Sequence, residues 1–350
     1  MHSRWYNITV IVLWLSAMTW LIATKVAPSF WFGEPPNSAS ILNAQKTSPV
    51  VGWWVAWCEG EHEKPLGWAL VETQPIPQDL VRINSLIQLH LPLSSLVPPS
   101  LRAWLGGLPL PDTKVLIESH SEMDFDPFGR LSRFESGVRQ LSAGEVTKLQ
   151  EPSGSSAPTP VYVAARKVDD LVKLRGAVDG DVLSLSVSTP NMLPFDIRAA
   201  APGAAVVKDP LSPQVALPGL RLGQRWTTEV YDPMEYLSRR GADCREILHA
   251  CVEREAVISW DDRSVHAMVV VFRSDPGATH DDDNVRGKLW VAPDGGVLRQ
   301  QVAMLGKTFV FVRMSDRQAK ALAAAWQKPN NPAWSGGMPG SAAARPAPYR

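Results

Sequence analysis

Between residues 49 and 327 the sequence contains many short stretches in which apolar and polar side chains alternate, and residues 80–91 (LVRINSLIQLHL) show this most plainly. One face of this stretch carries, with Ser85 as an interruption, Val81, Ile83, Ile87, Leu89 and Leu91. The opposite face carries, with Leu86 as the exception, Arg82, Asn84, Gln88 and His90. A period of two is typical of a half-buried β-strand, and a series of such strands favours an antiparallel sheet.

Thirty prolines and 24 glycines supply the turns that an all-β chain needs. Further strands are predicted at 50–58, 66–72, 114–125, 131–140, 171–178, 181–189, 226–231, 247–260, 265–273, 288–292, 297–305 and 308–313. Asp179-Gly180 between two of them indicates a short hairpin. Ser315 with Gln318 forms a capping-box pattern and predicts a short C-terminal helix, and residues 98–106 predict another helix.

The fold class predicted is mainly β, a curved antiparallel sheet or half-barrel meander. Residues 123–136 and 289–302 share a strand-turn-strand frame, which indicates either two similar halves or two hairpins with similar turn chemistry. We expect a first β-rich half over 49–150, a linker over 151–160 (EPSGSSAPTP) and a second β-rich half over 161–327, with the Pro-rich span 190–218 as the alternative point of division.

The N-terminal segment is the strongest indicator of location. Residues 8–24 carry no charge and are flanked by aromatic side chains, so residues 1–27 are predicted to be a transmembrane signal anchor, with a cleaved signal peptide as the alternative. Residues 28–48 are predicted to be a linker, and residues 328–350 a disordered tail. The predicted location is the inner membrane, crossed once, with the C-terminal domain facing the periplasm.

Charge argues against one class of partner. Thirty-five basic residues balance 35 acidic ones, and the basic residues form no stripe, so we expect no nucleic-acid binding. The partners expected instead are the membrane, and a lipid or an envelope protein complex.

Two acidic clusters with histidine resemble metal sites at first sight. They are residues 59–63 (EGEHE) and residues 280–283 (HDDD). Consecutive side chains diverge, and neither cluster has the ligand spacing of a zinc or calcium site, so both are interpreted as loop tips. We expect no metal, no cofactor and no catalytic residue of the common hydrolase motifs.

The three cysteines are Cys58, Cys244 and Cys251. Cys244 and Cys251 are too far apart along a strand or a helix to bridge each other unless the chain reverses between them. Two alternatives stay open: a Cys58–Cys251 disulfide, or three free buried thiols.

Several phrases resemble those of uncharacterised, membrane-anchored exported bacterial proteins. They are GWALVET, FDPFGRL, LRGAVDGDVLSLSV, LPGLRLGQRWTTEVYDP and GKLWVAPDGGVLRQQVAMLG, the fourth containing Gly223, Trp226, Thr227, Val230, Tyr231, Asp232 and Pro233. They are similar to β-rich regions of lipoprotein-carrier-like half-barrels and of domains that accompany exported transglutaminases. The resemblance implies a cup-shaped sheet that holds an acyl chain or hydrophobic peptide, or is filled by its own side chains. The Gly-x-Cys-Trp context of a transglutaminase is absent at all three cysteines.

The predicted function is therefore that of a membrane-anchored extracytoplasmic binding or accessory module. Trp53, Trp57 and Trp68 are the candidate ligand-lining residues, placed on one face with Trp54 on the other, and core packing is their ordinary alternative. The alternative functions are an exported hydrolase with a site assembled from residues such as His249 and Cys251, and a purely structural envelope protein.

Overall fold

The computed structural model describes residues 2–22, 35–59, 62–92, 114–142, 166–180, 182–189, 192–200, 206–207, 212–231, 245–277, 284–304 and 307–326. Its helices are α1 (His2–Leu21), α3 (Ser38–Thr47) and α7 (Asp316–Trp326). The strands β1 to β8 are Val50–Glu59, His62–Pro75, Val81–Pro92, Lys114–Phe125, Leu131–Ser142, Arg166–Asp179, Val182–Thr189 and Met192–Ala200. The strands β9 to β15 are Val206–Val207, Arg225–Tyr231, Arg245–Trp260, Arg263–Arg273, Val285–Val291, Val297–Met304 and Lys307–Arg313.

All fifteen strands belong to one sheet, which consists of two meanders. The order is β8-β7-β6-β5-β4-β3-β2-β1-β15-β14-β13-β12-β11-β10-β9, so the first meander runs from β1 to β8 and the second from β9 to β15. They meet where β1 pairs antiparallel with β15, in the register Trp53↔Arg313; we call this pair of strands the seam. Only the short pairing of β9 with β10 is parallel. Among the described residues no pairing joins β8 to β9, so the sheet is not closed.

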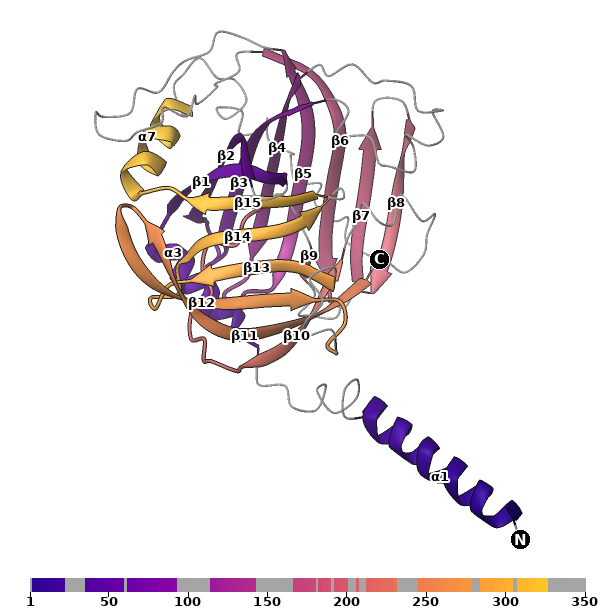
Figure 1. Ribbon diagram of the computed structural model, residues 1–350. Coiled ribbons are helices and arrows are strands. Elements are labelled where there is room, and N and C mark those ends of the chain that lie inside the picture. The colour runs from indigo at the N-terminus through magenta and orange to yellow at the C-terminus, as the bar shows by residue number, and fades with distance from the viewer. Residues whose placement is uncertain are drawn as a thin grey trace.

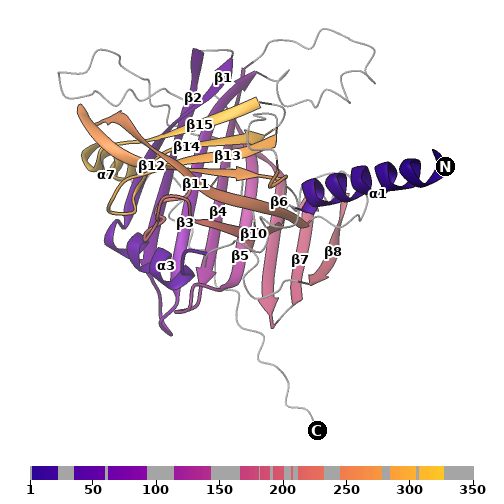
Figure 2. The same cartoon turned by 60° about the horizontal axis from the view of Figure 1, so that its bottom comes forward.

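The sheet folds over at the seam, so that its two meanders form two layers. The strands β10–β15 cross steeply over β1–β8 in Figure 1, and the view in Figure 2 shows the same two layers. The main hydrophobic core lies between the layers, because it joins residues of β1–β4 to residues of β10–β15. We call the sheet face toward this core the inner face. The predicted mainly β, curved antiparallel sheet is confirmed at this level.

The two faces predicted for residues 81–91 are confirmed, although Gln88 of the polar face is buried, with 1 % of its surface exposed. Val81, Ile83, Ser85, Ile87, Leu89 and Leu91 are buried, and the pairing of Ala69 with Ile87 and of Gly67 with Leu89 places them on the inner face. The exception, Leu86, is also buried, but on the outer face, where it belongs to a second apolar cluster with Trp68 and Trp326.

Helix α7 covers that outer cluster. Ser315 and Gln318 form the predicted capping box, since the backbone N–H of Ser315 donates to Gln318 Oε1 at 3.1 Å and that of Gln318 to Ser315 Oγ at 3.4 Å. Trp326, in the last turn, meets Trp68 edge-on with ring centroids 5.7 Å apart. Gly52 of β1 allows the start of α7 to lie close to the sheet, because a Cβ at this position would lie 2.7 Å from the Met314 sulfur and 3.2 Å from the Ala319 backbone.

The second part of the segment predicted to be a linker, residues 28–48, contains the helix α3 (Ser38–Thr47). The side chain of Asn37 caps the helix by accepting from the N–H of Ala39 at 2.9 Å. Leu42 is 3 % exposed and joins the main core. One buried leucine with a good cap is enough to fix a short helix against the sheet, although the segment has little apolar periodicity.

Strand β8 was not predicted, because its segment, MLPFDIRAA, contains Pro194 and follows a Pro-rich stretch. It lies at one end of the strand order. Proline is tolerated on such an edge strand, where its missing N–H leaves no ladder bond unmade.

The predicted transmembrane anchor over residues 1–27 is not supported. Residues 2–21 do form helix α1, which projects away from the two layers in both views. However, no helix in the described part of the chain is long and apolar enough to cross a membrane.

Three of the predicted segments lie outside the described residues: the helix over 98–106, the linker over 151–160 and the tail over 328–350. The boundaries of the two predicted halves stay predictions. What the strand order adds is that the two meanders part between β8 and β9.

Candidate functional site

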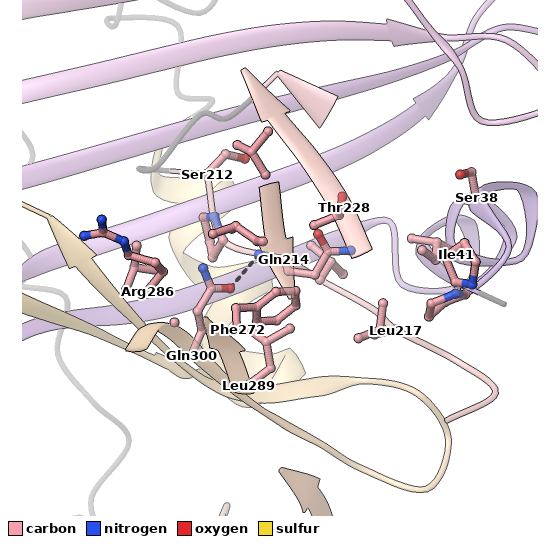
Figure 3. Close-up of a pocket in the computed structure, with 18 of the residues that line it drawn as sticks. Ser38, Ile41, Ser212, Gln214, Leu217, Thr228, Phe272, Arg286, Leu289 and Gln300 are labelled. Atoms are coloured by element: carbon pink, nitrogen blue, oxygen red, sulfur yellow. Dashed lines mark hydrogen bonds between the residues drawn. The ribbon is translucent and has the colours of Figure 1, made fainter. Parts of the chain in front are cut away.

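A cavity of about 600 Å³ lies between the two layers, away from the seam. One wall comes from the inner face of β2–β4, through Val71, Ile83, Met123 and Phe125. The opposite wall comes from β10–β14 and includes, as Figure 3 shows in part, Trp226, Thr228, Leu248, Phe272, Gly287, Leu289, Gln300 and Val302. This volume lies within the range of about 300–1,000 Å³ that is usual for small-molecule sites.

The side chains of the second wall explain why space remains there. Trp226 and Phe272 are in edge-on contact, with centroids 6.2 Å apart, and form an aromatic base. Next to them the inner face carries small or polar groups: Thr228 on β10 and Gly287 on β13, the latter opposite Phe272. A face that alternates large with small side chains leaves room that the facing layer does not fill.

Helix α3 and one connecting segment complete the lining. Ile41 and Gln45 of α3 line the cavity at one end, and Figure 3 shows Ile41 beside Ser38 there. Residues 212–217 line another side and are tied to the β13–β14 hairpin. The N–H of Val297 donates to the Val215 carbonyl at 3.0 Å, and the N–H of Leu217 donates to the Gly295 carbonyl at 2.7 Å.

Gln300 is the polar side chain that this segment orients. It is 7 % exposed and lies opposite Leu289, on the inner face of β14. Its Oε1 accepts from the backbone N–H of Gln214 at 2.8 Å, while Gln214 Nε2 donates to the Ala216 carbonyl at 2.8 Å. Both glutamines line the cavity, and the bond between them is drawn in Figure 3.

An ion pair lies at the solvent side of the same lining. Arg286 and Glu246 are joined at 3.0 Å, with the arginine side chain 48 % exposed. A register shift between Phe272 and Arg273 leaves Arg286 as the extra residue of β13. Bulges of this kind redirect a side chain without ending a strand, and Arg286 is among the residues that line the cavity.

The tryptophans predicted as ligand-lining do not border this cavity. Trp53 and Trp57 are 0 % and 3 % exposed and pack in the main core at the seam, where Lys307 Nζ lies 4.0 Å from the Trp57 ring centroid. The prediction that Trp68 shares their face is wrong, because Trp68 pairs with Trp54 on the outer face. A register shift after Val55 makes Leu66 an extra residue, so parity counted along the sequence fails. A ligand-lining role for the three stays a prediction.

The acidic cluster at residues 59–63 ends the first hairpin, as interpreted from the sequence. Glu59 pairs with His62, so the chain reverses between them. Pro65 lies within β2 opposite Ala56, at the register shift, and not in the turn. Glu63 forms an ion pair with Arg299 of β14, and His62 is exposed. Within the described ranges, no group of three or more His, Cys, Asp or Glu side chains is placed to hold a metal; the cluster at 280–283 lies outside them.

The candidate hydrolase pair, His249 and Cys251, lies on the outer face of β11. His249 pairs with Thr227 on one side and Arg273 on the other, and Cys251 pairs with Arg225 and Val271. Burial lowers the pKa of His249, while the charge of Asp275 opposes this effect. Neither His249 nor Cys251 lines the cavity. Cys58 and Cys251 are free thiols, both half-buried, and Cys244 lies outside the described residues.

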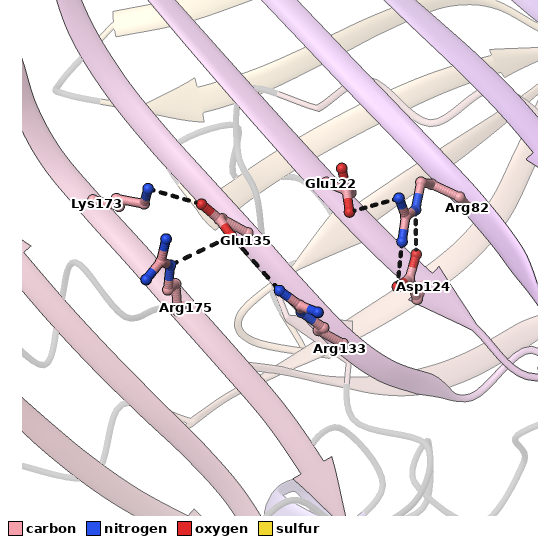
Figure 4. Close-up of polar contacts among 7 residues, drawn as sticks. All are labelled: Arg82, Glu122, Asp124, Arg133, Glu135, Lys173 and Arg175. Carbon is pink, nitrogen blue, oxygen red and sulfur yellow. Dashed lines mark hydrogen bonds and ion pairs between the residues drawn. The ribbon is translucent and has the colours of Figure 1, made fainter. Parts of the chain in front are cut away.

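The outer face of β3–β6 is polar and is organised by ion pairs (Figure 4). Arg82 binds Asp124 at 2.7 Å and Glu122 at 3.0 Å. Glu135 forms ion pairs with Lys173 at 3.0 Å and with Arg175 at 3.4 Å. Burial would raise the pKa of Glu135, but its hydrogen bonds and charge contacts with these two cations lower it below the ordinary value. Because cations and carboxylates alternate here, this face is interpreted as a structural surface.

No family model matches the chain, and no curated protein matches it. Among solved structures, it is similar to a "Beta-barrel-like Protein of Domain of Unknown Function DUF1849 from Brucella abortus". The identity is 8 %, the match covers 76 % of this chain and 94 % of the other, and the TM-score is 0.38.

The residues of the cavity had only weak signals in the sequence. Trp226 and Thr227 belong to the quoted GQRWTTEVYDP phrase, and Gly287, Leu289 and Gln300 to GKLWVAPDGGVLRQQV. Both phrases were interpreted as turn and strand chemistry. Their meeting across β10 to β14 depends on strand order, which one sequence does not reveal.

Proposed function

We propose that this chain is a binding module that holds an apolar ligand in the cavity between its two meanders. The observation that carries the proposal is the cavity itself, about 600 Å³ with walls from both layers. Burying apolar surface is worth roughly 25 cal/mol per Å², so side chains such as Phe125, Phe272 and Val302 favour a hydrocarbon or aromatic ligand over a strongly polar one.

The arrangement of the walls supports binding rather than catalysis. The lining combines apolar side chains with polar ones, among them Thr228, Glu229 and Gln300, and among the described residues it contains no His or Cys that could serve as a base or a nucleophile. His249 and Cys251, the pair considered for hydrolysis, lie on the other face of the sheet from Thr228 and Leu248. A nucleophile and base on that face do not reach a ligand held between the layers.

We also propose that the module works outside the cytoplasm, at the cell envelope. Helix α1 supports this, because most of its side chains from Ile8 onward are apolar and exposed, among them Ile11, Leu13 and Trp14, at 56 %, 69 % and 58 %. A helix of this composition needs a lipid or protein surface to cover it. Fractionation of cells that express the full chain tests the location, and recovery in the cytoplasmic fraction would contradict it.

The experiment on ligand binding uses the full chain and an uncharged, apolar fluorescent dye of the phenylnaphthylamine type. Thr228→Trp places a large side chain in the cavity and is expected to reduce dye binding at least tenfold. Ser264→Trp, at an exposed position of β12, is the matched control and is expected to leave binding unchanged. Equal binding by both variants and the parent chain would show that the dye binds elsewhere and would remove the support for the proposal. Native mass spectrometry of the purified chain then identifies any co-purifying lipid or peptide.

A further inference from the structure

The hydrogen bond from the Gln214 N–H determines which branch of the Gln300 side-chain amide is the oxygen. A backbone N–H only donates, so the atom of Gln300 that faces the Gln214 N–H at 2.8 Å must be the amide oxygen. The NH₂ group therefore occupies the other branch of the amide. In Figure 3 this nitrogen points away from Gln214, to the side on which Arg286 lies.

The NH₂ group of Gln300 is a donor at the wall of the cavity. Gln300 lines the cavity, and the structure records no acceptor for this group among the described residues. Its neighbours across the strands are Leu289 and Phe311, whose side chains offer none. Since this NH₂ group faces the cavity, an apolar ligand would bury it without a partner at a cost in free energy, whereas a ligand oxygen would accept its hydrogen bond.

The other lining groups near β13 are also donors. Arg286 has five N–H donors and no acceptor, and its ion pair with Glu246 uses Nε, which leaves other guanidinium N–H groups available. Thr228 adds a hydroxyl on the inner face of β10. Glu229 and Ile247 pair on the opposite face of β10 and β11, where Ile247 is 52 % exposed, so this carboxylate is directed away from the inner face.

We infer that the ligand of this cavity is an apolar molecule that ends in a carbonyl or carboxyl oxygen, and that Gln300 recognises this oxygen through its NH₂ group. The inference rests on the proposed binding function and adds the chemical class of the ligand and the residue that selects it. The apolar part of the ligand extends along the Phe272 and Val302 wall.

Three probes of equal chain length test this selection by displacing the dye from the full chain: dodecanoic acid, methyl dodecanoate and dodecane. One hydrogen bond made instead of one left unpaired corresponds to about a tenfold change in affinity. The acid and the ester are therefore expected to displace the dye at about tenfold lower concentration than dodecane. A stronger effect of the acid than of the ester assigns the natural ligand to free carboxylates, and equal effects assign it to esters or amides.

Two variants separate recognition from folding. Gln300→Glu keeps the acceptor for the Gln214 N–H and removes the donor, and Gln300→Leu removes both. Each is expected to abolish the preference for acid and ester while dodecane displaces the dye as before. Gln88→Leu is the matched control, because Gln88 is a buried glutamine, 1 % exposed, on the outer face of β3; it is expected to keep the preference.

The outcomes distinguish the two levels of the proposal. If all three probes displace the dye equally, or if the preference survives in both Gln300 variants, recognition by Gln300 is wrong and apolar binding stands. If no probe displaces the dye, or Thr228→Trp does not affect dye binding, the binding function itself is wrong.

Discussion

The two ends of the space between the meanders are built from different side chains. At the seam, Trp53, Val55 and Phe311 are 0 %, 1 % and 0 % exposed and fill the space completely. Beside β10, the corresponding inner-face positions include Thr228 and Gly287, and a cavity of about 600 Å³ lies there. One sheet thus has a solid end, where its layers are joined by hydrogen bonds, and an open end, where its layers are held apart.

The difference indicates that Trp53 and Trp57 are core residues of the seam. Large aromatic side chains gather where the sheet turns over and the backbone hydrogen bonds between β1 and β15 join the two layers. There they contribute stability through packing. At the open end, smaller and polar residues leave volume for a ligand. A cluster of aromatic residues in a β-rich sequence therefore marks a core more often than a binding site.

Truncating one aromatic residue at each end gives the largest expected effect. Trp53→Ala should lower the free energy of unfolding by about 3–5 kcal/mol, because it opens a cavity in fully packed surroundings. Phe272→Ala should cause less than half of this loss, since its ring already borders open space. Chemical denaturation with equal m-values for both variants measures the two losses. Equal losses would contradict the distinction between a solid and an open end.

Loss of the α7 anchor comes next in size. Trp326→Ala should destabilise the chain by about 3 kcal/mol, because this side chain is 2 % exposed and covers Trp68 on the outer face of the seam. Dye binding should stay unchanged, since α7 does not line the cavity. A large loss of dye binding at a temperature where the variant is folded would show that the two ends are coupled.

Enlarging one valine at each end is expected to change the stability by smaller amounts. Val55→Phe should cost about 1–3 kcal/mol, because overpacking a filled core forces side chains off their preferred rotamers. Val302→Phe adds the same atoms next to the cavity and should change stability by less than about 1 kcal/mol. Thermal unfolding of the two variants measures the difference, and a similar cost at both positions would mean that the open end is closed in solution.

The smallest effect concerns pH and the outer side of the open half. Because burial lowers the pKa of His249 in the folded chain, the unfolded chain binds a proton more readily there. This contribution to stability is complete above the unfolded pKa of 6.5 and is lost as the pH falls through the lower folded value. His249→Gln should flatten the stability profile in that window. An unchanged slope in the variant would assign the pH dependence to other groups.

Much of the local structure could be predicted from the sequence, because it depends on neighbours along the chain. The two faces of residues 81–91, the Asp179-Gly180 hairpin and the Ser315–Gln318 cap are of this kind. They follow from a period of two, from turn chemistry and from a capping pattern.

Features that depend on distant partners could not be predicted in this way. The extra residue at Leu66 reverses the parity of Trp68, and only the pairing of β1 with β2 reveals it. Helix α3 forms because Leu42 finds a place in the core. The cavity could not be predicted because its walls come from strands far apart in sequence. Thr228 and Gln300 of the second meander face the first meander only once the sheet has folded over.

The seam also has a consequence for the order of events during protein synthesis. Trp53 of the first strand pairs with Arg313 of the last one, in the middle of the strand order. The ribosome therefore releases β1 long before its central partner exists, and contacts so distant in sequence slow folding. Until β15 emerges, one edge of β1 stays unpaired and open to aggregation or to chaperones. A premature stop before residue 307 would remove a strand from the centre of the sheet, and we expect such a product to be degraded as a whole rather than to persist as a shortened domain.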